Sequence, residues 1–596
     1  MKNHALLLLL SLLLVPFVLP AQTTATAPTG SGTVGDPYII STLGELSYVA
    51  QNLGATNYWA SGVYLSQTAD IDASTTQYWD DADDNSDGDL FNDPNDGTAT
   101  GNNEGFKAIG NLSVRFYGNY DGQGYEISNL HVDRHYNASS VGIGLFGWLQ
   151  GGILENVRIV DANIEVEADY HYGVAAAAGG GSSALIDNVH VVGGTLNIVT
   201  GSSYNYGGGL VGRGSGLTIT NSSSTMDINS AVSTNDGLGG LIGYMEGTIF
   251  TVQDCYAAGN ITTAGGTRKG GFAGSLSAST GGNGLVERCY SIGTVTNTSG
   301  GGCGGFVGNP YFVTIRDCYT LSPISVTSSS SVGGFYASAP TDATYKPTFI
   351  NCYTASTITG GVTGGFGGYN NYVNTYTNCF WDTQTTGTNT GVPNGREGDL
   401  TGLTTVEMQT KSTFTDAGWD WVYETTNGAN DYWAIIAAYN SGYPFLKWAD
   451  FPLFPSHGGY ALDFDGTDDY VEIAHDVVLN PANITVEAWF YPEDIAGQNI
   501  PPIVKKVSAT EGYAIEINNA NSELRFHVRT AGDWYTSPAY VVPSLNQWYH
   551  VAGTYDGNDI QLYVNGVLIG ATNIVGSLTP STNVLAIGYD PVNAGR

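Results

Sequence analysis

Three glycines in the segment "YGGGLVGRGSG", residues 206–216, have the spacing G-x-G-x-x-G of a loop that binds a dinucleotide pyrophosphate: Gly207, Gly209 and Gly212. Such a loop joins a strand to a helix and occurs once in a chain, because the phosphates bind at one helix N-terminus. Here the core of the motif returns about every 30 residues, which is the period of a solenoid and not of a nucleotide site. The further copies begin at Gly239, Gly270, Gly304, Gly333 and Gly364, with a weaker one at Gly144.

Oxygen ligands suited to calcium are concentrated in "YWDDADDNSDGDLFNDPNDG", which holds eight aspartates between positions 80 and 96. The pattern D-x-N-x-D-G that ends at Gly88 matches the first half of a calcium loop, because its alternate oxygens converge where glycine permits a sharp turn. The match fails at the twelfth position, where Pro94 stands in place of a bidentate Glu. We therefore expect either a calcium loop or a solvated acidic loop. The candidate ligands are Asp83, Asn85, Asp87, Asp89 and Asp93.

A smaller group of aspartates lies in "FDGTDDYV" near the start of the C-terminal region. Asp465, Asp468 and Asp469 could ligate calcium. An Asp-rich turn that caps its own backbone explains the same residues equally well.

Aromatic residues in the C-terminal region suggest contacts with carbohydrate. Trp534 and Tyr535 lie in the turn-like stretch "TAGDWYTSP", where an exposed aromatic face would suit the apolar face of a pyranose. Trp489 and Trp548 fall instead within strand patterns, so we expect them to be core residues.

The elements that must position these groups repeat along the chain. A second marker, mostly Asn or Asp before an apolar residue, runs in phase with the glycine motif in segments such as "LENVRI" and "IRDCYT". Its nine registers predict about nine rungs of a parallel β-helix, with equivalent positions stacked about 4.8 Å apart. Glycine is needed where the coil turns with positive φ or where rungs approach closely, and stacked Asn or Asp side chains would form a ladder. The marker residues are Asn129, Asn156, Asn188, Asn221, Asp254, Arg288, Asp317, Asn351 and Asn378.

The repeat also assigns positions to the cysteines. Six cysteines in an exported protein would ordinarily suggest three disulfides. Five of them follow the marker in the column that Leu130, Val157 and Val189 occupy in earlier rungs. We expect buried thiols there, with disulfides between neighbouring rungs as the alternative, and no CxxC or nearby His favours zinc. Cys303 lies outside the column and is the thiol expected to be exposed or reactive. The five column residues are Cys255, Cys289, Cys318, Cys352 and Cys379.

Both ends of a β-helix need covers, because open strand edges promote association. Capping boxes predict a short amphipathic helix at each end: Thr42-x-x-Glu45 at the start and Thr404-x-x-Glu407 at the finish. The aromatic stretch from "AGWDWVYE" to "YPFLKW" would close the second end. The apolar residues expected on the two helices are Leu43, Leu46, Val49, Leu53, Met408 and Phe414.

Composition and the N-terminus define the class and the compartment. Only 12% of residues are charged while 82 are glycine and 38 tyrosine, which favours strands joined by tight turns. The formal net charge of -35 disfavours nucleic acid and fits calcium or a salty medium. The apolar run after Lys2 and His4 predicts a signal peptide cleaved after Ala21, with an uncleaved anchor as the alternative, and no second stretch is apolar enough to span a membrane.

The "GGLVG" repeats resemble the GLUG-motif repeats of bacterial surface proteins. The segments "DPYIISTLGEL", "FYGNYDGQGYEISNLHV" and "CFWDTQTTG" are similar to those that accompany such repeats. This resemblance covers about residues 30 to 450. It implies a secreted or surface protein, often adhesive, and transfers no catalytic residue.

After "FPLFPSH" the glycine period stops, and strand pairs with Asp-Gly or Asn-Gly turns predict an antiparallel sandwich. "FDGTDDYV", "TVEAWFY" and "WYHVAGTYDG" resemble the LamG-like jelly-roll domains of the concanavalin-like superfamily. The resemblance implies a sandwich that binds glycans or proteins, often with calcium. Family members continue past "IGYD" into a further strand, so we expect a sandwich truncated at Arg596.

These observations predict an all-β chain, a parallel β-helix solenoid with short helical caps followed by an antiparallel β-sandwich of the jelly-roll type. The predicted organisation is a signal peptide at 1–21, a linker at 22–36, a GLUG-repeat β-helix at 37–450 with an acidic insertion at 80–97, a linker at 451–457, and a LamG-like sandwich at 458–596.

Three classes of function fit this organisation: an adhesive protein, a polysaccharide-degrading lyase or glycosidase, and a purely structural spacer. A lyase needs Lys or Arg beside calcium and a glycosidase needs two carboxylates on neighbouring rungs, and the repeated positions are poor in both. Asp254 and Asp317 are interpreted as structural members of the ladder. We therefore expect no enzymatic activity. We predict a secreted or cell-surface adhesin whose partners are glycans or extracellular proteins, with calcium as the expected cofactor.

Overall fold

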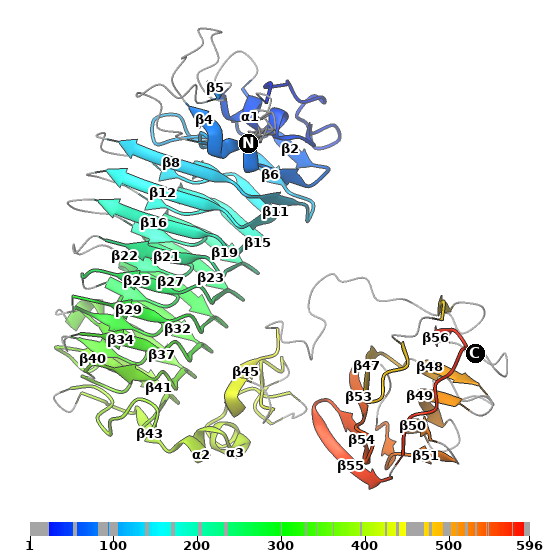
Figure 1. The fold of residues 1–596 in the computed structure, drawn as a ribbon. Coiled ribbons are helices and arrows are strands. Elements are labelled where there is room, and N and C mark those ends of the chain that lie inside the picture. Colours follow the sequence, from blue (N-terminus) through cyan, green and yellow to red (C-terminus); the bar gives the residue numbers. More distant parts are fainter. Residues whose placement is uncertain are drawn as a thin grey trace, which may run out of the picture. The chain divides into compact units, whose positions relative to one another are not determined.

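The structure is a computed structural model of the whole chain (Figure 1). It describes residues 23–51, 57–80, 93–94, 105–136, 142–168, 173–200, 206–231, 237–266, 268–299, 301–327, 331–340, 343–361, 363–393, 396–422, 426–428, 430–436, 440–448, 470–475, 479–492, 502–508, 511–518, 522–530, 533–543, 545, 548–574 and 576–588. The chain forms two compact units, Met1–Gly418 and Trp419–Arg596. Over the described ranges, no helix is both long enough and apolar enough to cross a membrane.

The first unit is a parallel β-solenoid (Figure 1). Each strand pairs with its equivalent one turn later: Val174 lies opposite Gly207, and Leu185 lies opposite Thr218. The predicted all-β class and parallel β-helix are thereby confirmed, with about seven turns. One face is a seven-stranded sheet of β9 (Gly142–Ile143), β13 (Gly173–Val174), β17 (Tyr206–Gly208), β22 (Gly237–Gly239), β26 (Arg268–Gly270), β30 (Cys303–Gly304) and β35 (Val332–Gly333).

A second face is an eight-stranded sheet that follows the corner after each marker segment. It contains β8 (His131–Tyr136), β12 (Asn163–Ala168), β16 (Thr195–Thr200), β21 (Asp227–Ser230), β25 (Ile261–Thr263), β29 (Val295–Asn297), β34 (Ile324–Val326) and β39 (Ile358–Thr359).

A third sheet of the solenoid has 26 strands, and the marker column and the five column cysteines lie along it. Its strands are β1 (Tyr38–Ile40), β2 (Tyr64–Gln67), β3 (Ile71–Asp72), β6 (Asn119–Asp121), β7 (Glu126–Ser128), β10 (Phe146–Gln150), β11 (Ile153–Val160), β14 (Ala178–Ser182), β15 (Leu185–Val192), β18 (Val211–Ser215), β19 (Thr218–Thr220), β20 (Ser223–Ser224), β23 (Ile242–Gln253), β24 (Tyr256–Ala257), β27 (Ala273–Glu287), β28 (Tyr290–Ser291), β31 (Val307–Tyr311), β32 (Val313–Arg316), β33 (Tyr319–Thr320), β36 (Tyr336–Ser338), β37 (Thr348–Ile350), β38 (Tyr353–Thr354), β40 (Gly367–Tyr369), β41 (Thr375–Thr377), β42 (Phe380–Asp382) and β43 (Thr401–Leu403). Short 3-10 helices lie at Ser74–Tyr78 and Ala343–Tyr345.

Eight of the nine marker residues, from Asn156 to Asn378, form one column at a corner of the coil. All eight have φ between 50° and 53°, a left-handed conformation that Asn and Asp adopt more readily than other non-glycine residues. The ninth assignment is wrong, because the pairing of His131 with Asn163 places Asn129 in register with Asp161, at the next corner. Leu130 therefore lies outside the cysteine column. Seven full turns lie between the first and the last of these eight column residues, so the predicted number of about nine rungs was too high.

The predicted ladder of polar side chains is confirmed along much of this column. Asn188 Nδ2 donates to Asn156 Oδ1 at 2.8 Å, and Asn351 Nδ2 donates to Asp317 Oδ1 at 3.0 Å. Asp254 accepts from the next member, Arg288, instead of from an amide. Asn156, Asp254 and Asp317 thus each accept a hydrogen bond from the next member of the column, which places Asp254 and Asp317 in the predicted ladder.

The glycine motif lies in β17 and β18 and the tight turn between them, with no helix following it. Gly207, Gly209 and Gly212 do not have positive φ, so close approach and not left-handed turning requires them. A Cβ on Gly209 would lie 1.9 Å from Ser224 Oγ and 2.5 Å from Gly240 O. These glycines pack successive turns together, and the strand-to-helix geometry of a dinucleotide loop is absent from this described segment.

The five column cysteines are buried free thiols, as the repeat predicts. Each thiol donates to the carbonyl oxygen two residues earlier, at 3.0 Å for Cys255 and 3.3 Å for Cys379. Burial raises the pKa of Cys255 and Cys379 well above the ordinary thiol value. The expectation for Cys303 is wrong: this residue of β30 is fully buried against Val295, Val332 and their neighbours, and burial raises its pKa to about 11.

Both predicted capping helices are present. In α1 (Leu43–Gln51), Glu45 N donates to Thr42 Oγ1 at 3.2 Å and Thr42 N donates to Glu45 Oε2 at 3.0 Å. In α2 (Thr405–Met408), the same reciprocal bonds join Thr404 and Glu407. The buried apolar residues are Leu43, Leu46 and Val49 in α1, Met408 in α2 and Phe414 in α3 (Lys411–Thr415), whereas Leu53 lies outside the described residues.

Helix α3 packs on the last turn of the solenoid and forms part of its cover. The Phe414 ring lies 5.5 Å from the Phe380 ring, edge to face. The aromatic stretch that begins at Trp419 belongs to the second compact unit, where β44 (Trp433–Ala434) pairs with β45 (Phe445–Leu446) near a 3-10 helix at Asn440–Gly442. Closure of the solenoid by that stretch stays a prediction.

The C-terminal part of the second unit is an antiparallel sandwich, as predicted. Its larger sheet contains β46 (Val471–Ile473), β56 (Leu585–Ile587), β48 (Pro502–Ser508), β49 (Glu511–Asn518), β50 (Glu523–Arg529), β51 (Trp534–Thr536) and β52 (Tyr540–Val541). Its smaller sheet contains β47 (Ile484–Phe490), β53 (Tyr549–Tyr555), β54 (Asp559–Val564) and β55 (Val567–Asn573). Phe526 of the larger sheet and Val551 of the smaller one belong to the same buried core.

Candidate functional site

The two predicted calcium sites fall largely outside the described residues. These undescribed candidates are Asp83, Asn85, Asp87, Asp89, Asp465, Asp468 and Asp469, and the proposed signal peptide at 1–21 lies outside the described part as well. Asp93 is in β5 (Asp93–Pro94), opposite Asp80 of β4 (Trp79–Asp80). Where the structure does describe the chain, no three His, Cys, Asp or Glu side chains are grouped to hold a metal ion. Calcium therefore stays a prediction.

The predicted aromatic pair lies on a strand and not in a turn. Trp534 and Tyr535 both belong to β51, so their side chains point to opposite faces of the larger sheet. Tyr535 packs against the core, which removes it as a sugar platform. Trp534 is 37% exposed, and the Arg529 guanidinium carbon lies 5.6 Å from its ring centroid.

Polar residues extend from Trp534 across the outer face of the same sheet. Register places Arg529 opposite Trp534 and His527 opposite Thr536. Lys505 Nζ donates to Glu516 Oε2 at 3.1 Å, and His527 Nε2 lies 3.4 Å from Glu516 Oε1. Burial lowers the pKa of His527 against the opposing effect of the Glu516 charge, which favours a neutral imidazole. This face offers an aromatic edge with donors and acceptors arranged beside it.

Trp489 and Trp548 were expected in the core, and both are half-buried outside it. The reason is strand alternation: Ile484, Val486 and Phe490 face the core, so Trp489 faces outward. This alternation in "ITVEAWF" is visible in the sequence and would have identified Trp489 as a surface aromatic.

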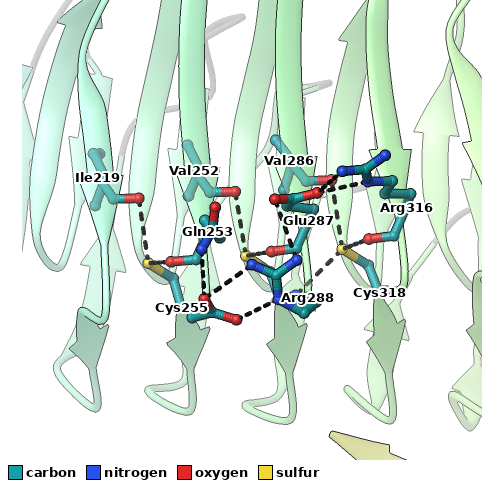
Figure 2. A network of polar contacts seen from close by, with 11 residues as sticks. Ile219, Val252, Gln253, Cys255, Val286, Glu287, Arg288, Arg316 and Cys318 are labelled. Carbon is teal, nitrogen blue, oxygen red and sulfur yellow. Dashed lines mark hydrogen bonds and ion pairs between the residues drawn. The ribbon is translucent and has the colours of Figure 1, made fainter. Parts of the chain in front are cut away.

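The solenoid carries a dense polar network beside the cysteine column (Figure 2). Arg288 Nε donates to Asp254 Oδ1 at 2.7 Å, and its Nη1 lies 3.2 Å from Glu287 Oε1. Arg316 Nε donates to Glu287 Oε2 at 2.6 Å. The side chains of Asp254, Glu287 and Arg288 are 16%, 7% and 11% exposed, so two guanidinium groups compensate two shielded carboxylates. This arrangement joins successive turns of the solenoid through ion pairs.

A second acidic arrangement on the solenoid was missed by the reasoning from sequence. Strand register stacks Asp121, Glu155 and Asp187 on three consecutive turns. Asp121 accepts from Asn156 Nδ2 at 2.9 Å, and Asp187 accepts from Asn221 Nδ2 at 2.8 Å. Burial, with the charges of Asp121 and Asp187, raises the pKa of the half-buried Glu155 between them. Glu155 and Asp187 each stand directly before a marker Asn, so the aligned segments contained a signal for two members of the stack. Asp121 was missed because Asn129 was aligned with the marker in its place.

The fold and these sites define an all-β protein with a parallel β-solenoid and a separate antiparallel sandwich. Residues 465–596 match the family Laminin_G_3, described as the Concanavalin A-like lectin/glucanases superfamily. The C-terminal module is thus a concanavalin-like domain of the LamG type.

Relatives by sequence are similar over parts of the chain. Halomucin of Haloquadratum walsbyi is 32% identical over 29% of this chain and 2% of its own length. Human pappalysin-1 is 26% identical over 23% of this chain and 10% of its own length. The chain thus spans a small fraction of these curated relatives.

Solved structures that resemble the chain do so at low overall similarity. The crystal structure of a putative immunoglobulin A1 protease from Bacteroides ovatus covers 71% of this chain and 95% of that one, at 17% identity and a TM-score of 0.32. Domains LG4-5 of the mouse laminin alpha1 chain cover 21% of this chain and 32% of that one, at 14% identity and a TM-score of 0.18.

Proposed function

We propose that this chain is a secreted or cell-surface adhesin, in which the solenoid is a stalk and the concanavalin-like sandwich binds glycans or extracellular proteins. The observation that carries the proposal is Trp534, exposed at the edge of a sheet face with Arg529 beside it and the Glu516–His527 pair one row away. An aromatic ring flanked by directional polar groups suits a ligand with an apolar face and a hydroxyl rim. The predicted signal peptide and the GLUG resemblance support export.

Calcium enters the proposal through the acidic segment. Asp83, Asn85 and Asp87 would supply oxygen ligands to a bound calcium ion, and a chelator would remove that ion. A chelator arm in each binding experiment therefore separates calcium-dependent from calcium-independent adhesion.

The test uses the whole exported chain on an array of glycans and on immobilised extracellular matrix proteins, with calcium or with chelator. The Trp534→Ala variant is compared with Val541→Ala, which removes an exposed apolar side chain from the same sheet. Specific binding that Trp534→Ala weakens and Val541→Ala retains would support adhesion through this face. Binding to no glycan and no protein would refute adhesion and favour the spacer.

A second function, cleavage of a polysaccharide, is favoured by the stack of Asp121, Glu155 and Asp187. Neighbouring strands lie about 5 Å apart, which is close to the separation of the two carboxyl groups in retaining glycosidases, and a raised pKa suits Glu155 to a general acid. Release of reducing sugars from a panel of polysaccharides, lost in Glu155→Gln, would establish this activity. No release from any polymer would leave the stack as a structural feature.

A further inference from the structure

The smaller sheet of the sandwich carries aromatic side chains on the face that points away from the core. Val486, Ala488 and Phe490 of β47 face the core, so Glu487 and Trp489 face outward. Register places Trp489 opposite His550 and puts Tyr563 in the row of Glu487. Outward positions of an antiparallel sheet are ordinarily polar, so aromatic residues there indicate a contact surface.

The outward aromatic groups lie in neighbouring rows. The Trp489 ring centroid is 5.0 Å from the His550 ring, and the Tyr491 ring centroid is 5.5 Å from the Trp548 ring. Tyr491 is 40% exposed, and Trp489 and Trp548 are half-buried. Two aromatic pairs, rather than one isolated ring, therefore follow the direction of β47.

Polar groups accompany these rings on the same face. The Glu487 side chain is 66% exposed, and its Oε2 lies 3.6 Å from His550 Nε2. Within the part of the chain that the structure describes, the buried His550 Nδ1 has no hydrogen-bond partner. Tyr563 Oη donates to Gln561 Oε1 at 2.8 Å, which adds an amide next to the acidic row. The face thus combines apolar rings with a carboxylate acceptor and an amide.

We infer that this face binds a neutral glycan chain, with sugar rings stacked on Trp489 and on the Tyr491–Trp548 pair and with hydroxyls donating to Glu487. The inference rests on the proposed function and deepens it by assigning a second binding face and a class of ligand. The chain charge of -35 and the exposed Glu487 repel polyanionic glycans and a second copy of the chain. A neutral polysaccharide supplies apolar ring faces and hydroxyl donors without that repulsion.

The experiment measures binding of the full chain to laminarin and cellohexaose as neutral probes and to polygalacturonate as an anionic probe. The variants are Trp489→Ala and Glu487→Gln, and the matched control is Thr485→Ala, an exposed position on the same strand and face. Loss of a stacked ring is expected to weaken neutral-glycan binding about tenfold or more. If Trp489→Ala does not fold, Tyr491→Ala replaces it, and thermal unfolding of each variant reports folding.

The outcomes separate this inference from the proposed function. Neutral-glycan binding that falls about tenfold in Trp489→Ala, and persists in Thr485→Ala and Trp534→Ala, supports the inference. Glycan or protein binding that the Trp489 and Glu487 variants leave unchanged overturns the inference and leaves adhesion standing. Binding of polygalacturonate alone, or of a protein alone through Trp489, overturns the assigned ligand. Absence of all binding overturns the proposed function together with the inference.

Discussion

Replacing Gly209 by alanine tests whether the glycine motif exists to pack turns of the solenoid. Its φ lies outside the left-handed region, so alanine is conformationally allowed and would by itself stabilise the fold by about 0.4–1 kcal/mol. The added Cβ, however, would lie 2.5 Å from Gly240 O, more than about 1 Å inside ordinary contact. That oxygen also accepts the Gly209 N–H at 3.2 Å, so it cannot retreat without breaking the ladder.

The expected result is a destabilisation of about 3 kcal/mol, at the upper end of the usual cost of overpacking. Denaturant unfolding of the full chain measures it, and hydrogen exchange of the turns around residues 206–246 locates it. Gly35→Ala is the matched control, because no atom lies within 4 Å of its added Cβ, and we expect it to be neutral or slightly stabilising. Equal stabilities of the two variants would refute close packing as the role of this glycine.

Three further predictions concern charge and thiols. Arg288→Ala should destabilise the solenoid by about 3 kcal/mol, because it leaves the shielded Asp254 carboxylate without its guanidinium partner. Arg288→Asn should cost less, since Asn suits the left-handed backbone at this position. Denaturant unfolding compares the two variants, and equal losses of stability would count against the ladder. Burial lowers the pKa of His527 and His550, so below about pH 6.5 the unfolded chain binds more protons than the folded chain. The free energy of unfolding should therefore fall as the pH drops from about 7 towards about 5. His527→Gln should make that fall shallower, and an unchanged dependence on pH would contradict the prediction. Cys303 should react with a thiol reagent only after unfolding, and fast labelling of the native chain would show that its burial is wrong.

The solenoid could be predicted from sequence because its contacts repeat between nearest neighbours. A turn packs on the next turn at the same position, so glycine, marker and cysteine columns appear directly as a period. The mistake at Asn129 shows the limit of that reasoning. Two corners of the coil both use a left-handed residue, and the segment "ISNLHV" resembles the marker although it stands at the second corner, with Asp161.

The sandwich sites were harder to predict, because the face on which a side chain lies depends on register. Trp534 and Tyr535 are adjacent in sequence and lie on opposite faces of β51. Its place within a strand pattern predicts Trp489 in the core, while the alternation along that strand puts it outside. Cys303 was assigned to the surface because it left one column, and the pairing of β30 puts it into another buried one.

The difference between the two units bears on where a ligand can bind. In the described part of the solenoid, several polar side chains bond to the equivalent residue one turn away: Asn188 to Asn156, and Asp254 to Arg288. Side chains that bond within such a ladder are not free to contact a ligand, which agrees with the proposal that the sandwich faces bind. The stack centred on Glu155 departs from this rule, because three like charges follow one another where opposite or neutral partners would be more stable. Residues that are unfavourable to their local structure are concentrated at functional sites. Glu155 is therefore the position on the solenoid at which a search for activity should begin.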